Sequence, residues 1–187
     1  VINGNYAISA GLNVAEALAV EDAASEAAQT YANILVVKEG NENTPKIKAL
    51  VAALSSQKVA DFITATYKGA VVSTVDAPTD GFDASVDYAA LAGQTITVAA
   101  SPAPHAEILA VAKEILAEKN VTLEVIEFTD YVQPNNVVES GEIDANYFQH
   151  TPYLESFNAS NGTELSVADL IHYEPFGMYG NGVSSVA

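Results

Sequence analysis

The 187-residue sequence contains no cysteine, no tryptophan and no arginine, so its seven basic residues are all lysines. Without cysteine the chain can form no disulfide, no thiolate metal site and no cysteine nucleophile. No apolar run approaches the ~20 residues that span a bilayer, and residues 1–6 lack the basic-then-apolar pattern of a signal peptide. We therefore expect the chain as given to be soluble, with any targeting segment removed or outside this sequence.

Basic residues are scarce as well, since 24 acidic side chains face those seven lysines and the net charge is -17. A surface this acidic repels phosphate backbones and anionic lipid headgroups. We therefore expect no nucleic-acid partner and no binding to a membrane surface through charge.

Hydrophobic residues make up 49% of the chain, enough for a buried core. The first half predicts a short helix over 13–19, a buried strand over 31–38 and two helices. The first of these helices starts at Thr44-Pro45, a capping hydroxyl before a first-turn proline, and the second runs over 57–68 and stops near Gly69.

The second half predicts strands over 96–100 and 123–128, with a helix between them. A strand, a helix and a strand within about 30 residues form a βαβ unit, which implies parallel pairing. We expect a further strand over 144–149, a helix from Thr151 that ends at Asn161-Gly162, and an edge or crossover segment over 167–179 that contains Pro175. The fold class is therefore α/β.

Residues 75–94 separate the two halves. Asp, Ala, Gly and Pro dominate this stretch, its periodicity is weak and it contains no basic residue. We expect a linker that runs along the surface with few contacts. The strands on its two sides are too few to form separate layers, so 31–38, 96–100 and 123–128 should share one sheet.

Four stretches together resemble one known family. They are SPAPHAEIL at 101–109, EFTDYVQPN at 127–135, GEIDANYFQHTPYLESFN at 141–158, and VINGNYA followed by GLN at 1–13. With YKGAVV at 67–72, they resemble the NlpA-type methionine-binding lipoproteins. This resemblance implies a single lobe of the type II periplasmic-binding-protein fold, with a mixed, mostly parallel sheet flanked by helices.

The segment order differs from that family, because the block that resembles the family's C-terminus comes first here. We expect one lobe over 1–187 built from a C-terminal-type segment (1–74), the linker (75–94) and an N-terminal-type segment (95–187), circularly permuted, with the second lobe absent. Either an engineered permutation or a fragment across the junction of a tandem fusion would give this order.

The resemblance also implies the ligand-binding residues. An aromatic cleft for the methionine thioether and two amides for its charged groups would be formed by Tyr131, Phe148, His150, Tyr153, Asn3 and Asn33. Aromatic walls suit a thioether, and an amide offers both donors and an acceptor to a zwitterion. From spacing alone, Phe148 and Tyr153 would be ordinary core aromatics.

The implied function is that of a substrate-binding component of an ABC importer, not an enzyme, with methionine or a close analogue as ligand and no cofactor. Its partners would be the permease subunits and the missing second lobe, which in this family supplies an arginine to the ligand carboxylate. The full-length parent would be extracytoplasmic and lipid-anchored. With no arginine in the chain, we expect this fragment to bind weakly or not at all.

Other functions stay open. The ligand could be another small apolar amino acid or a methionine-containing dipeptide, and a lobe detached from its partner could be an interaction domain without a ligand. A hydrolase would need His150 with a carboxylate such as Asp144, but no nucleophile motif accompanies them. His105-x-Glu107 and the 144–150 stretch place imidazoles near carboxylates, yet no HExxH or His-x-His spacing occurs, so we expect no metal site.

Overall fold

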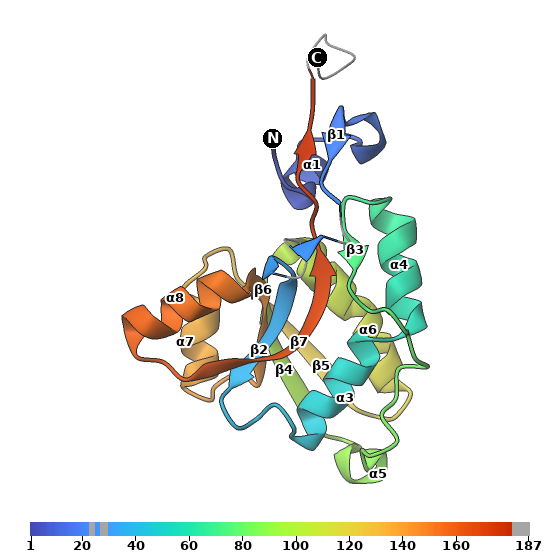
Figure 1. Cartoon of the computed structure of the whole chain (residues 1–187). Helices are drawn as coiled ribbons and strands as arrows, with labels where there is room; N and C mark the ends of the chain where they lie inside the picture. The colour runs from blue at the N-terminus through green and yellow to red at the C-terminus, as the bar shows by residue number, and fades with distance from the viewer. Residues whose placement is uncertain (23–24, 27–29, 181–187) are drawn as a thin grey trace.

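The computed structural model describes residues 1–22, 25–26 and 30–180. Its body is built on a six-stranded sheet with the order β3-β7-β2-β6-β4-β5 (Figure 1). The strands are β2 (Asn33–Lys38), β3 (Val72–Ser73), β4 (Thr95–Ala100), β5 (Thr122–Glu127), β6 (Ala145–His150) and β7 (Leu165–Tyr173). Segments from both sides of residues 75–94 therefore share one sheet, which confirms the prediction for 31–38, 96–100 and 123–128.

The βαβ unit also forms as predicted. β4 and β5 pair in parallel, and α6 (Glu107–Ala117) connects them after a short irregular helical segment, η2 (Pro102–Ala106). The apolar positions of α6 recur at helical spacing and are buried, among them Ile108, Ala112 and Ile115. The local spacing of apolar residues was therefore sufficient to predict this unit.

The expectation of a mostly parallel sheet is wrong. β4 pairs in parallel with β5 and β6, but β2 is antiparallel to both β6 and β7, and β3 is antiparallel to β7. Burial on both faces gives β2 a continuous apolar run whatever its direction, so its sequence does not distinguish the two pairings. β7 lies inside the sheet and is not an edge strand, and Pro175 lies in the irregular segment that follows it.

Helices cover both faces of the sheet (Figure 1). α3 (Pro45–Leu54) and α4 (Gln57–Tyr67) pack with α6 on one face, and α7 (Gln133–Glu139) and α8 (Thr151–Asn161) pack on the other. The larger core includes Leu50, Ile63, Leu109 and Tyr147, and the smaller one lies under α7 and α8. Gly162 ends α8 with a left-handed φ of 66°, as the Asn-Gly pair predicts.

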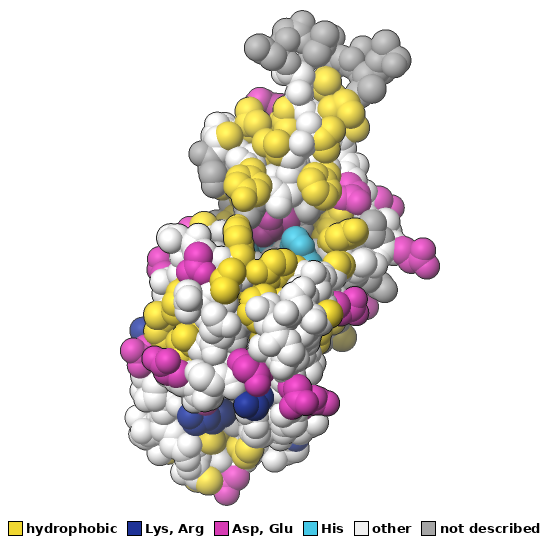
Figure 2. Space-filling model, turned by 90° about the vertical axis from the view of Figure 1, so that its left-hand side faces the viewer, with side chains coloured by type: hydrophobic (Ala, Val, Ile, Leu, Met, Phe, Trp, Pro, Cys, Tyr) yellow, Lys and Arg dark blue, Asp and Glu magenta, His cyan; other side chains and the backbone are white. Residues whose placement is uncertain are grey.

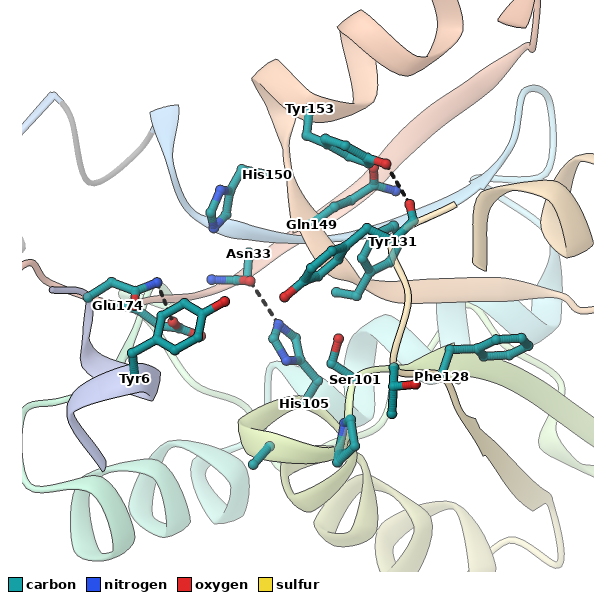
Figure 3. Close-up of a pocket in the computed structure, with 15 residues that line it drawn as sticks. Tyr6, Asn33, Ser101, His105, Phe128, Tyr131, Gln149, His150, Tyr153 and Glu174 are labelled. Atoms are coloured by element: carbon teal, nitrogen blue, oxygen red, sulfur yellow. Dashed lines mark hydrogen bonds between the residues drawn. The ribbon is translucent and has the colours of Figure 1, made fainter. Parts of the chain in front are cut away.

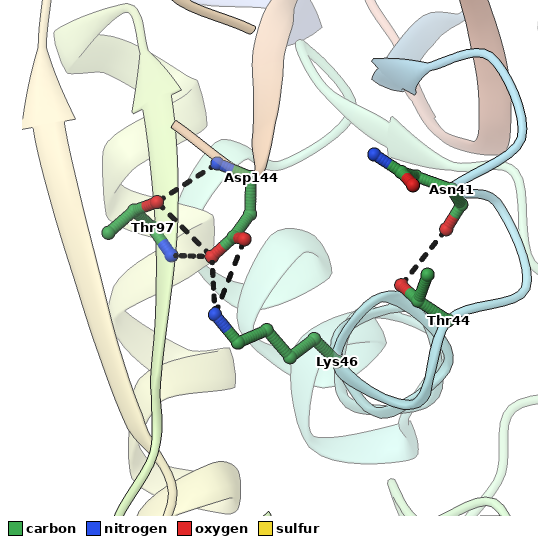
Figure 4. A network of polar contacts seen from close by, with 5 residues as sticks. All are labelled: Asn41, Thr44, Lys46, Thr97 and Asp144. Carbon is green, nitrogen blue, oxygen red and sulfur yellow. Dashed lines mark hydrogen bonds and ion pairs between the residues drawn. The ribbon is translucent and has the colours of Figure 1, made fainter. Parts of the chain in front are cut away.

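A polar network joins α3 to the neighbouring parallel strands β4 and β6 (Figure 4). The Asp144 carboxylate accepts hydrogen bonds from the Thr97 backbone N–H at 2.9 Å and from its hydroxyl at 3.2 Å, and it pairs with Lys46 Nζ at 3.2 Å. Thr44 precedes α3 as expected, but its hydroxyl donates to the Asn41 carbonyl at 3.0 Å instead of capping the helix. The predicted capping role of Thr44 is therefore wrong.

Residues 75–94 run along the surface as expected, but they make more contacts with the body than expected. Val86 and Leu91 are buried, and Leu91 closes the short helix α5 (Tyr88–Leu91). Thr79 exchanges backbone hydrogen bonds with Ser55 and Gln57, and Phe82 packs against the larger core. These few apolar side chains, spread between Asp, Ala and Gly, give no periodicity that the sequence could reveal.

A small unit projects from the end of the sheet beyond β7 (Figure 1). It contains α1 (Gly4–Ser9), the single turn η1 (Val14–Glu16), and an antiparallel pair of β1 (Ala19–Val20) with β8 (Gly177–Met178). The predicted helix over 13–19 is thus reduced to one turn capped by Asn13. Within the described ranges, no helix is long and apolar enough to cross a membrane.

Candidate functional site

A cavity of about 540 Å³ opens at one end of the sheet, where the small unit meets the body (Figure 3). Parallel strands gather their carboxyl ends at one edge, the usual place for a ligand in an open α/β sheet. Because β2 runs the opposite way, its first residue reaches that same edge, where Asn33 pairs with His150 of β6 and His172 of β7. Strand direction thus brings distant polar residues together.

All six residues predicted from the resemblance line this cavity: Asn3, Asn33, Tyr131, Phe148, His150 and Tyr153. They come from the small unit, from β2, from the loop before α7, and from β6 and α8. The structure therefore places them together, while their contact with a ligand remains a prediction.

Aromatic rings form one wall of the cavity. Tyr131 stacks on Phe148 with ring centroids 5.9 Å apart, and Phe148 meets Tyr153 edge-on at 6.0 Å. The Tyr153 hydroxyl donates to the Tyr131 carbonyl at 2.5 Å. Asp130 accepts hydrogen bonds from the backbone N–H groups of the two residues that follow Tyr131, which lowers the Asp130 pKa and holds the Tyr131 loop in place.

The small unit supplies Asn3 and Tyr6 to the opposite side. Backbone hydrogen bonds of 3.1 and 2.8 Å between Ile2 and Gly177 of β8 hold the N-terminal residues within this unit. Gly4 is required here, because a Cβ at this position would lie 1.8 Å from the Ala70 carbonyl oxygen. The Tyr6 side chain hydrogen-bonds Tyr131 across the opening, which together with burial raises the pKa of Tyr131.

Polar groups line the floor. His105 Nε2 lies 2.8 Å from Asn33 Oδ1, and Asn33 Nδ2 is buried without a hydrogen-bond partner among the described residues. Asn3 Nδ2 donates to Glu174 Oε2 at 3.3 Å, and Asn3 Oδ1 is likewise buried and unpartnered within the described chain. Two residues that line the cavity, Asn33 and Asn3, therefore retain a buried donor and a buried acceptor that no described residue uses.

A buried series of hydrogen bonds continues behind Glu174. Its Oε1 accepts from His172 Nε2 at 3.0 Å, and His172 Nδ1 bonds the Tyr147 hydroxyl. Burial, followed by the charge of a neighbouring histidine, lowers the pKa of both His105 and His172 to about 3. Both imidazoles are therefore neutral at physiological pH.

Sequence reasoning missed Tyr6, His105, His172 and Glu174 as a group. One signal was present: His172 and Glu174 are two residues apart in an extended segment, which places them on one face. His105, His172 and Glu174 bring three ligand atoms within 4.8 Å of one another, as a metal site would. The Nε2 atoms of both histidines already take part in hydrogen bonds, so we interpret the cluster as a polar network.

The His150–Asp144 pair considered for a hydrolase does not form. Asp144 precedes β6 and bonds Thr97 and Lys46, whereas His150 ends β6 at the cavity and meets Tyr31 edge-on at 6.2 Å. The length of the strand separates the two side chains.

The surface around the opening is hollowed and largely hydrophobic. Figure 2 shows a histidine at the bottom of the hollow, ringed by apolar side chains with acidic groups nearby. Tyr131 is 52% exposed and Tyr6 59% exposed, so both rings stand at the rim. An open apolar cleft with a few buried polar groups is typical of a small-molecule site.

A family model described as NlpA lipoprotein matches residues 1–75 and 96–187. The methionine-binding lipoprotein MetQ of Bacillus subtilis is 46% identical over 92 residues, which are 49% of this chain and 34% of that protein. The membrane lipoprotein TpN32 of Treponema pallidum is 36% identical over 86 residues, 46% of this chain and 32% of that protein. The chain thus spans about a third of the length of these relatives.

Among solved structures, a phosphate-binding protein of a phosphate ABC transporter from Streptococcus pneumoniae matches 83% of this chain and 55% of its own, with a TM-score of 0.54 and 13% identity. This likeness shows a shared α/β fold.

Proposed function

Because the chain belongs to the NlpA lipoprotein family, we propose that it carries the methionine-binding lobe of an ABC importer's substrate-binding component. The parent protein would be held outside the cytoplasmic membrane by a lipid anchor and would deliver its ligand to permease subunits. The ligand is methionine or a close analogue.

One observation carries the proposal: six residues from separate stretches of the chain line one cavity. The cavity volume of about 540 Å³ lies in the range of small-molecule sites. Its aromatic wall suits a thioether, since sulfur–ring contacts contribute about 0.3–1.5 kcal/mol each. The unused amide groups of Asn3 and Asn33 suit the charged ends of an amino acid.

We further propose that residues 1–74 and 95–187 form one lobe in circularly permuted order. The two matched ranges and the strands that they contribute to one sheet support this arrangement. A second lobe would close over the cavity and add a cation for the ligand carboxylate, a bidentate role that arginine fills better than lysine.

This proposal predicts weak binding by the 187-residue chain alone. Titration with L-methionine, followed by nuclear magnetic resonance, should shift cavity residues with a dissociation constant in the millimolar range, because each 1.4 kcal/mol lost weakens binding about tenfold. His150→Ala should reduce these shifts without unfolding the chain. Leucine and a methionyl dipeptide in the same titration separate the alternative ligands.

Two outcomes would contradict the proposal. Submicromolar binding to this chain would refute the need for a second lobe. Shifts that avoid the cavity, or their absence with all three ligands, would refute the ligand assignment.

A further inference from the structure

We propose that Glu174 is a positioning residue: it holds the Asn3 amide through Nδ2, so that Asn3 Oδ1 is left as a fixed acceptor for the ammonium group of a ligand in the cavity. The inference rests on the proposed function, because it assigns a task within the same cavity. It selects ligands with a free ammonium group.

The first step concerns the two ends of an amide, which have similar shapes and opposite hydrogen-bonding character. Asn3 Nδ2 lies 3.3 Å from Glu174 Oε2. Reversing the amide would press Asn3 Oδ1 against a carboxylate oxygen, and both atoms only accept. Asn3 also stands at the N-cap of α1 without making a capping hydrogen bond, so helix capping does not orient it.

The second step concerns what orients Glu174. Neutral His172 carries one ring proton, and that proton lies on Nε2 because the facing Glu174 oxygen only accepts, at 3.0 Å. Nδ1 is then an acceptor, and the Tyr147 hydroxyl donates to it. The two hydrogen bonds therefore run in one direction, with Tyr147 donating to His172 and His172 donating to Glu174. The site is buried, since the exposed fractions of these three residues are 0%, 0% and 6%.

The third step concerns the complementary amide. Asn33 Oδ1 bonds His105 Nε2, which leaves Asn33 Nδ2 as a buried donor without a partner among the described residues. Figure 3 shows Asn33 between Glu174 and Tyr131, with its bond to His105 dashed. An acceptor at Asn3 and a donor at Asn33 match the ammonium and the carboxylate of one zwitterion.

Glu174→Gln tests the orientation without a ligand. The new side-chain oxygen can still accept from His172, so the new amide nitrogen would face Asn3 and the Asn3 amide would reverse. In the wild type the Asn3 amide protons should exchange slowly with solvent, and in E174Q they should exchange fast from the cavity side. The exposed control Glu118→Gln should leave them unchanged. Equal exchange in wild type and E174Q would overturn the inference.

A second arm measures ligand preference by the same resonance titration. The ratio of affinities for L-methionine and its 2-hydroxy analogue should fall about tenfold in E174Q, the size of one lost charge-assisted hydrogen bond. In an Asn3→Ala background, E174Q should change this ratio no further. A further drop there would show that Glu174 contacts the ammonium group directly and would overturn a positioning role.

If E174Q does not fold, as judged by circular dichroism, N3A alone tests the acceptor. N3A should lose the preference for methionine over the hydroxy analogue, and an unchanged preference would overturn the inference. Failure of the proposed function looks different: neither compound would shift any cavity resonance in the wild type, while the exchange of the Asn3 amide would still judge its orientation.

Discussion

Tyr147 is a fully buried ring whose hydroxyl bonds His172 Nδ1, its one polar partner within the described part of the chain. Tyr147→Phe should lower the free energy of unfolding by about 1–3 kcal/mol, because it leaves a buried acceptor without a partner. Urea denaturation measures the change. Tyr31→Phe is the matched control, since that ring is 48% exposed, and it should be neutral. Equal effects of the two variants would show that the hydroxyl of Tyr147 contributes nothing.

His105 and His172 also predict how stability depends on pH. Their folded pKa is about 3, below the ordinary 6.5, so between these values the unfolded chain binds protons that the folded chain does not. Stability should therefore fall as pH decreases below 6.5, by roughly 1 kcal/mol per pH unit for each histidine. Urea denaturation between pH 7 and about 5 measures this effect above the range of most carboxylates. His150, whose pKa is also lowered by burial, adds to the same trend.

A variant separates the histidines from other groups. His105→Gln removes one such group, so its stability should decline less steeply over the same pH range, whatever its stability at pH 7. A flat wild-type profile, or an identical slope in the variant, would contradict the buried neutral state of these rings.

The candidate site residues show what a sequence can predict at this scale. Tyr131, Phe148 and His150 lie in motifs that resemble a family, and the structure brings them to one cavity. Glu174 has no such motif and is one of 24 acidic residues, so only its place after a buried strand distinguishes it. His172 is 2 positions from Glu174 in the sequence, but Asn3 is 171 positions away, and no local sequence pattern predicts a contact over that separation.

At the scale of elements, the network around Asp144 joins a helix to two strands. Asp144→Ala removes the acceptor of the Thr97 N–H and hydroxyl, and should lower the free energy of unfolding by about 1–2 kcal/mol. The control is Glu114→Ala, which breaks an exposed pair with Lys58 and should change stability by less than about 0.5 kcal/mol. Chemical denaturation measures the free energy of unfolding of both variants. Equal losses in the two variants would show that the network contributes no more than a surface ion pair.

Helices and strands with strong local signals were predictable. The strand over 31–38, the helix after Thr44 and the helix ended by Gly162 all form within a few residues of their expected bounds. The direction of the strands could not be predicted in the same way, because the antiparallel pairing of β2 depends on partners more than 100 residues away. The short helix expected over 13–19 failed because its apolar residues 17–20 extend toward β8 instead of facing a core.

At the scale of the whole molecule, residues 75–94 contribute two buried side chains, Val86 and Leu91, to the larger core. Replacing 79–92 by Gly and Ser at constant length should lower the free energy of unfolding by about 2–5 kcal/mol, since Val86 and Leu91 lose their buried positions. Loop closure is unchanged at constant length, so the loss reflects the missing packing together with the greater freedom of glycine in the unfolded chain.

The control for this replacement changes only Asp76 and Ala77, which are exposed, to Gly and Ser. This variant should keep its stability in urea denaturation. A full replacement that is equally stable would restore the expectation of a linker with few contacts.

The small unit that carries Asn3 contacts the body at its base. Asn3 donates to Glu174, the Tyr173 hydroxyl donates to Glu21, and Gly4 packs against the Ala70 backbone. A ligand held by Asn3 and Asn33 together would add a further link between this unit and the sheet. Its binding free energy would then contribute to the stability of the attachment, and a change that loosens the attachment would weaken binding by the same free energy.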